Sequence, residues 1–160
     1  MYLYLKQKVF ALREKFTFFD ERQNVVFTSK GSFFALPKKF IVYENDAAVA
    51  EIRRAFISFL PKFSIYDLSA NTLECKLKQK FSFMKNFALS MPGGDLRIDG
   101  SLFGYEFDIK TPEGHSVLSV HKKYISWGDT YQVYFDETRI APKIAAAIVV
   151  AIDNAVHPHK

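Results

Sequence analysis

The C-terminal segment Thr138 to Val156 constrains this chain most, because its centre, Ile144 to Ile152, carries only apolar side chains. A helix on a protein surface shows an apolar stripe beside a polar face, and this segment has no polar face. Its length and the six alanines from Ala141 to Ala155 favour a helix over a buried strand, the alternative that isoleucine and valine leave open. Crossing a bilayer takes about 20 apolar residues, and the run from Ile144 to Ile152 is too short for that. We therefore expect a helix that is buried in the core of the protein.

The charged residue that ends this apolar run is Asp153. A carboxylate near a helix C-terminus opposes the helix dipole, and it is costly beside apolar groups unless it has a partner. An ion pair with Arg54 or Lys122 is one interpretation, since both share a strand phase with apolar neighbours. The other is that Asp153 lies where the helix leaves the core and is solvated. The helix residues expected to build the core are Ile144, Ile148, Val149, Ile152 and Asp153 itself.

The composition favours one β-rich domain over residues 1–160. Aromatic residues make up 16% of the chain, and 17 residues are phenylalanine, which is typical of strands. The single cysteine, Cys75, excludes a disulfide within the chain and is typical of a reducing compartment. The first ten residues show neither a signal peptide nor a lipidation motif. We therefore expect a cytoplasmic protein without a transmembrane segment, with a peripheral position at a membrane as the further expectation.

Alternating apolar and polar residues between turn signals predict ten to twelve strands. The clearest alternation runs from Leu73 to Phe83, where Cys75 and Phe81 belong to the apolar phase and a row of lysines to the polar one. A second predicted strand, Val49 to Phe59, returns from a polar turn and ends before Pro61. The pattern therefore predicts a series of hairpins.

An internal repeat is visible at an offset of 68 residues. The segment VAEIRRAFISFLPKFSIY from Val49 to Tyr66 matches VLSVHKKYISWGDTYQVY from Val117 to Tyr134 without a gap. Aromatic, basic and serine positions coincide as well as apolar ones. Any two hairpins of a β-rich chain share some pattern, but these coincidences favour two similar β halves.

These elements combine in few ways. A sandwich buries side chains between sheets about 10 Å apart and has no room for a whole helix, whereas a barrel widens with strand number. Alanines keep the helix thin enough for a snug interior. About twelve strands would hold a helix, so we predict a closed or nearly closed antiparallel barrel around the C-terminal helix.

Five segments form a combined pattern over the chain: the opening MYLYLKQKVFALREKFTFFDE, GSFF, SFLPKFSIY, WGDTYQV and the closing IAAAIVVAID. Together they resemble the LURP-one-related family, whose bacterial members are often named YxjI-like. This family is grouped with the tubby C-terminal domain and the phospholipid scramblases, so the resemblance implies a twelve-stranded barrel around a hydrophobic C-terminal helix. Tubby-like domains bind phosphoinositides through surface lysine and arginine. The segment Asp95 to Gly100 lacks the spacing of a calcium loop, so calcium-dependent scrambling is not expected.

The sequence contains no pattern typical of a catalytic or metal site. The four histidines and Cys75 lack zinc spacing, and neither a nucleophile elbow nor a phosphate-binding loop is present. We therefore expect no enzymatic activity and no cofactor.

The remaining functional feature is a surplus of lysine and arginine, which gives a net charge of +5 and favours acidic partners. The residues expected to bind an anion are Lys38, Lys39, Arg53, Lys76, Lys78, Lys80 and Lys123, with Lys6, Lys8, Lys62 and Lys85 as further basic positions. We expect a non-catalytic module that binds anionic phospholipid or another phosphate-bearing ligand. The alternative is a structural or signalling protein that acts through protein contacts. Nucleic acid is the less expected partner, because stacking needs aromatic residues among the lysines.

Overall fold

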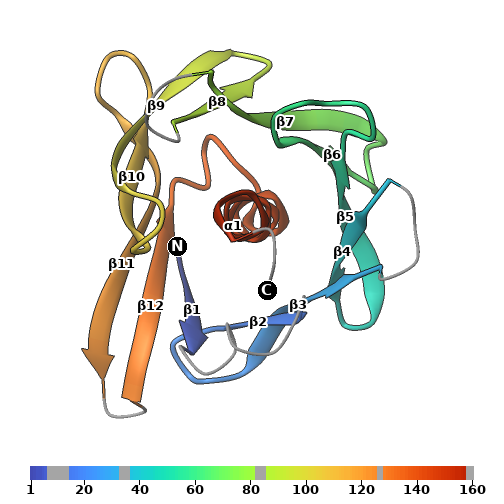
Figure 1. Cartoon of the computed structure of the whole chain (residues 1–160). Helices are drawn as coiled ribbons and strands as arrows, with labels where there is room; N and C mark the ends of the chain where they lie inside the picture. Colours follow the sequence, from blue (N-terminus) through green and yellow to red (C-terminus); the bar gives the residue numbers. More distant parts are fainter. Residues whose placement is uncertain (7–14, 33–36, 82–85, 126–127, 158–160) are drawn as a thin grey trace.

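The computed structural model describes residues 1–6, 15–32, 37–81, 86–125 and 128–157. Within these ranges, twelve antiparallel strands form a closed barrel around one helix, which confirms the predicted architecture (Figure 1). Each strand pairs with its neighbours in the sequence, and β1 closes the ring by pairing with β12. The elements are β1 (Tyr2–Lys6), β2 (Lys15–Phe19), β3 (Val25–Gly31), β4 (Lys39–Glu44), β5 (Ala47–Arg54), β6 (Lys62–Asp67), β7 (Thr72–Gln79), β8 (Phe87–Met91), β9 (Gly94–Ser101), β10 (Glu106–Lys110), β11 (Ser116–Ile125), β12 (Gly128–Phe135) and α1 (Pro142–Val156).

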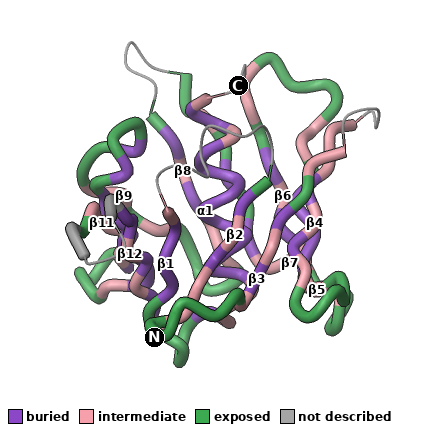
Figure 2. The backbone as a smooth tube through the Cα atoms, turned by 90° about the horizontal axis from the view of Figure 1, so that it is seen from below, coloured by how far each residue is buried: buried purple, intermediate pink, exposed green. Residues whose placement is uncertain are grey.

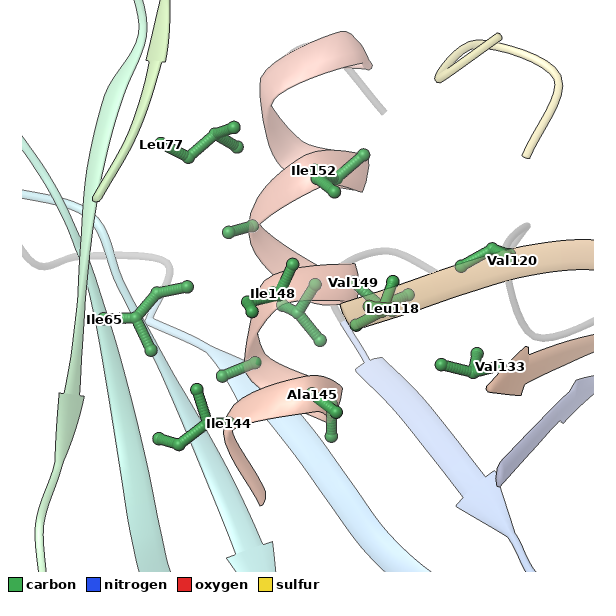
Figure 3. Close-up of a cluster of buried hydrophobic side chains, with 14 of the residues drawn as sticks. Ile65, Leu77, Leu118, Val120, Val133, Ile144, Ala145, Ile148, Val149 and Ile152 are labelled. Carbon is green, nitrogen blue, oxygen red and sulfur yellow. The ribbon is translucent and has the colours of Figure 1, made fainter. Parts of the chain in front are cut away.

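The helix α1 fills the centre of the barrel, and its apolar side chains meet the inward side chains of the strands. Ile144, Ile148, Val149 and Ile152 are all at most 2% exposed. Figure 3 shows the isoleucines and Val149 between Ile65 and Leu77 on one side and β11 and β12 on the other. The alanines between these residues are also fully buried, which lets the strands close around a narrow rod. No helix in the described ranges has both the length and the apolar character to cross a membrane.

The two ends of the barrel differ, and the helix gives them a direction. The C-terminus of α1 lies at the end drawn at the top of Figure 2, and the N-terminus of the chain lies at the bottom. We call these the upper and lower ends. The strands β5, β7, β9 and β11 all run toward the upper end because antiparallel strands alternate in direction. Tight turns join the strands at the lower end, such as the turn at Asn45 and Asp46, which both have positive φ.

Two predicted strands end earlier than their sequence pattern indicated. The strand expected from Val49 to Phe59 ends at Arg54, and its last five residues enter the loop before β6. The strand expected from Leu73 to Phe83 ends at Gln79, and Phe81 is 90% exposed rather than part of the inward row; Phe83 lies outside the described residues. Both predictions were wrong because the apolar phase continues past the point where hydrogen bonding to the neighbouring strand stops.

The internal repeat corresponds to two hairpins on opposite sides of the barrel. The first copy covers β5 and β6, and the second covers β11 and β12. Six strands separate the copies in a ring of twelve, so a half turn about the barrel axis relates them. The loops at their tips differ in length, since residues 55–61 join the first pair and residues 126–127 join the second. The two halves of the chain are therefore alike in sheet topology and different at the upper end.

Candidate anion-binding surface

The register of four neighbouring strands brings basic side chains together on the outer surface of the barrel. Lys39 on β4 pairs with Arg53 on β5, Arg53 pairs with Ser64 on β6, and Ser64 pairs with Lys76 on β7. Their neighbours along the strands are buried, so these residues point away from α1. The buried neighbours are Phe40, Ile52, Ile65, Cys75 and Leu77. Since neighbouring strands lie about 4.8 Å apart, the whole row spans about 14 Å.

Lys62 and Lys78 form the second row and lie directly opposite each other on β6 and β7. Both side chains are exposed. Like charges in directly opposed positions destabilise a sheet. Within the described parts of the chain, no carboxylate lies within 4.0 Å of either ammonium group. The positive charge of this pair is therefore available to a bound anion. We call Lys39, Arg53, Lys62, Lys76 and Lys78 the basic face.

Glu51 partly neutralises the edge of the basic face that lies over β4 and β5. Its carboxylate accepts a hydrogen bond from the Arg53 guanidinium and lies 3.8 Å from the ammonium of Lys39. This hydrogen bond is the main reason that the pKa of Arg53 is raised. The guanidinium also covers the ring of Tyr66 at 4.5 Å from its centroid, so one face of this aromatic ring is occupied. The uncompensated charge accordingly lies toward β6 and β7.

A groove of about 610 Å³ opens at the upper end of β6 and β7. It runs between the loop that precedes β6 and the residues that follow β7. Three lysines and two phenylalanines line it, together with a proline: Phe59, Pro61, Lys62, Lys78, Lys80 and Phe81. Lysine ammonium groups are donors to phosphate oxygens, and three lysines line this one groove.

The other predicted anion-binding residues have different surroundings. Lys80 follows β7 and belongs to the groove. Lys38 is half-buried just before β4, with its ammonium 5.3 Å from the centroid of the Phe40 ring. Lys123 is exposed on β11, four strands from β7, and so lies away from the basic face. Lys8 and Lys85 lie outside the described residues.

The position of Asp153 contradicts the interpretation that it is solvated where the helix leaves the core. Its side chain is buried rather than solvated, with 7% of the residue exposed. Its partners include the Tyr105 hydroxyl, which donates a hydrogen bond, and Nδ1 of His157 at 3.3 Å. The His157 ring stacks on Tyr105 with centroids 5.8 Å apart. Burial and the nearby Asp153 carboxylate raise the pKa of Tyr105, which keeps this hydroxyl a donor.

Neither a reactive thiol nor a group of metal ligands is present among the described residues. Cys75 is buried on β7, and burial raises the pKa of its thiol to about 12, so the reactive thiolate is rare at neutral pH. Among the residues with described positions, no three histidine, cysteine, aspartate or glutamate side chains are grouped as metal ligands.

Sequence reasoning identified the basic residues but not their partners. The alternation of β7 places Lys76 and Lys78 on one side of a strand, and this is readable from spacing alone. The pairing of Lys62 with Lys78, and of Lys39 with Arg53, depends on the register between strands. A further opposed pair of lysines, Lys15 and Lys30 on β2 and β3, was missed for the same reason.

Comparison with known proteins places this fold in a family. The model of the family described as LURP-one-related matches residues 1–153. The chain is 30% identical over 160 residues to the uncharacterized protein YxjI of Bacillus subtilis (strain 168), covering 97% of this chain and 93% of that protein. An X-ray structure of an Arabidopsis thaliana protein is similar in fold, with a TM-score of 0.66 and 15% identity over 96% of this chain and 89% of the other. The chain belongs to the LURP-one-related family.

Proposed function

We propose that this protein is a non-catalytic module that binds anionic phospholipid, or another phosphate-bearing ligand, through the basic face. The observation that carries the proposal is the directly opposed pair of Lys62 and Lys78, whose charges no described carboxylate balances. The fold keeps two like charges side by side on a rigid sheet, and an anion between them relieves their repulsion. The groove beside them offers a third ammonium group from Lys80.

The strength of such binding follows from the number of charges that meet the ligand. A lysine or arginine near an anionic membrane surface contributes about 1 kcal/mol, so three or four acting together give weak but selective association. The interaction weakens with salt because exposed charges are screened over about 10 Å at 0.1 M salt. Binding that responds to salt is therefore expected.

Vesicle co-sedimentation tests the proposal. We expect the protein to sediment with vesicles of equal parts phosphatidylserine and phosphatidylcholine, and to remain in solution with phosphatidylcholine alone. The double variant Lys62→Gln/Lys78→Gln should reduce binding about tenfold or more, since it removes the opposed pair. A matched control is Arg22→Gln/Arg139→Gln, which removes the same charge from exposed positions at the lower end. Equal losses in the two double variants would reduce the effect to net charge and contradict a specific face.

A soluble phosphate-bearing probe separates the two sources of the ligand. Inositol hexakisphosphate that binds the wild-type protein and competes with vesicles would show that phosphate groups are what the basic face recognises. Binding of this probe without any binding to vesicles would assign the face to a soluble ligand. Absence of both would refute the proposed function.

A second candidate function is action through protein contacts. The observation that favours it is a loop with exposed apolar side chains, in which Phe59 is 96% and Ile57 is 92% exposed. Self-association in sedimentation velocity experiments, lost in a Phe59→Ser variant, would support this function.

A further inference from the structure

Four large apolar side chains project from the upper end of the barrel next to the basic face. Phe56, Ile57 and Phe59 belong to the loop between β5 and β6, and Phe81 follows β7; they are 66%, 92%, 96% and 90% exposed. We call these four residues the apolar tips. Phe59 and Phe81 line the same groove as Lys62, Lys78 and Lys80. Exposed apolar side chains grouped in this way usually mark a surface that meets a partner or a membrane.

The charged residues are also distributed unevenly along the barrel axis, with basic residues toward the upper end, where the apolar tips lie. Basic residues lie near the upper ends of eight strands: Lys6, Lys15, Lys30, Lys39, Arg53, Lys62, Lys78 and Lys123. Acidic residues gather in and beside the lower turns: Asp20, Glu21, Glu44, Asp46, Asp67, Asp95, Glu113, Asp136 and Glu137.

Three cations of the lower end pair with acidic residues. Lys143 pairs with Asp67, Arg139 pairs with Asp136, and Lys110 pairs with Asp99. The lower end is therefore locally balanced or acidic, and the surplus positive charge lies at the upper end.

We propose that the upper end of the barrel docks on an anionic bilayer, with the apolar tips inserted among the lipid headgroups and the lysines of the groove held at the phosphate level. This inference rests on the proposed function and deepens it, because it names the membrane as the partner and fixes the orientation of the barrel on it. The acidic lower end then points away from the membrane.

The chemistry of a bilayer interface fits this surface in two ways. Aromatic and aliphatic side chains gain from burial at the boundary between headgroups and acyl chains, and neighbouring lysines gain from anionic lipid. Two of the apolar tips, Phe59 and Phe81, line the groove with Lys62, Lys78 and Lys80, so one shallow insertion satisfies both kinds of side chain. A protein partner would instead need an apolar counterpart surrounded by carboxylates.

Site-specific labelling tests the orientation. The only native cysteine, Cys75, is buried with a raised pKa, so a thiol-reactive dye will select an introduced exposed cysteine. One variant carries Phe59→Cys at the upper end. The matched control carries Ala70→Cys, exposed in the lower turn between β6 and β7. Each is labelled with an environment-sensitive fluorophore and mixed with vesicles of equal parts phosphatidylserine and phosphatidylcholine.

We expect a blue shift of emission and quenching by brominated acyl chains for the label at position 59, and neither change for the label at position 70. In a second measurement, Ile57→Ser/Phe59→Ser should lower vesicle partitioning about tenfold or more. The loss should persist at high salt, whereas the loss in Lys62→Gln/Lys78→Gln should be greatest at low salt. Circular dichroism of both variants will establish that the barrel remains folded.

The outcomes separate this inference from the proposed function. Vesicle binding with an unshifted label at position 59 would overturn insertion of the tips and leave anion binding in place. The same conclusion follows if the protein binds inositol hexakisphosphate but no vesicle. A dimer that forms without lipid and disappears in Ile57→Ser/Phe59→Ser would assign the tips to a second copy of the chain and overturn the membrane assignment. If the protein binds neither vesicles nor inositol hexakisphosphate, both the proposed function and the membrane orientation are refuted.

Discussion

The ammonium group of Lys143 lies 2.7 Å from Oδ1 of Asp67 and joins the first turn of α1 to the lower end of β6. Both side chains are mostly buried, at 19% and 14% exposure. Ser69 completes the cluster, since its hydroxyl donates to Asp67 and accepts from Lys143. The start of α1 has no side-chain cap, because its N-cap residue is Ala141. The ion pair is therefore an anchor that holds the helix inside the barrel.

This anchor predicts a loss of stability in acid. Burial alone would raise the pKa of Asp67, but hydrogen bonds from Lys143 and Ser69 outweigh burial and lower it from 3.8 to about 2. A carboxylate whose pKa is lowered by folding stabilises the fold at pH values above its pKa in the unfolded chain. That contribution disappears as the pH falls through the pKa of the folded state. We expect Asp67→Asn to cost about 1–3 kcal/mol at pH 6. Urea unfolding curves of the variant and the wild type should converge near pH 2.

The core helix predicts a strong dependence on side-chain volume. Ile148 is 1% exposed at the centre of α1. Truncation to alanine leaves a cavity that the surrounding strands can fill only in part, so Ile148→Ala should cost about 2–5 kcal/mol. The same substitution at the exposed Ile57 should leave the free energy of unfolding almost unchanged and serves as the control. Similar effects at both positions would contradict a close-packed barrel interior.

The sequence predicted the parts of this fold that depend on local pattern. The all-apolar run from Ile144 to Ile152 identified the central helix, and strand alternation separated Cys75 and Leu77 from the lysines of β7. The ends of the strands were harder to predict, because Phe56 and Phe81 continue the apolar phase of their strands although both side chains are exposed. The sequence could not predict that the basic residues meet on one face, because the pairing of Lys62 with Lys78 depends on how the strands pack around the whole barrel.

Asp153 shows why buried polar contacts resist sequence reasoning. Its partner Tyr105 is 48 residues away, in the loop between β9 and β10. The backbone of Tyr105 has a positive φ of 54°. Neither the internal repeat nor strand phase indicates that this tyrosine turns toward the end of α1. The repeat aligns Arg54 with Lys122, and both share a phase with inward residues.

Removal of the Tyr105 hydroxyl should destabilise the barrel, because it breaks a contact to the end of α1. Tyr105→Phe leaves the buried Asp153 carboxylate without its donor from this residue, and a hydrogen bond to a charged group contributes about 1.5–3 kcal/mol. We expect the free energy of unfolding at neutral pH to fall by that amount. Tyr2→Phe, at a 41% exposed residue of β1, is the control and should change stability little. An equal, small effect in both variants would show that the contact contributes nothing to the fold.

His121 predicts a titration that is visible near neutral pH. Its two ring nitrogens lie 2.8 Å from Glu106 and 3.3 Å from Asp108. Burial lowers the pKa of His121, but the two carboxylates outweigh burial and raise it above 6.5. The stabilisation is fully present below pH 6.5 and is lost as the pH rises through the raised value. Proton NMR of the imidazole should show a midpoint above 6.5 that moves down in Glu106→Gln; a midpoint at 6.5 or below would contradict these contacts.

Ser29 gives a prediction of the opposite sign. Its side chain points into the barrel from β3 and is fully buried, and in the described part of the chain its hydroxyl has no hydrogen-bond partner. An unpaired buried hydroxyl loses its bonds to water on folding without replacement, which costs about 1–3 kcal/mol. We therefore expect Ser29→Ala to raise the free energy of unfolding by about 1 kcal/mol, offset in part by the small volume lost. Ser64→Ala, on the outer surface of β6, should have no such effect. A clear fall in stability of Ser29→Ala would mean that the hydroxyl is satisfied inside the barrel, by a water molecule held against α1.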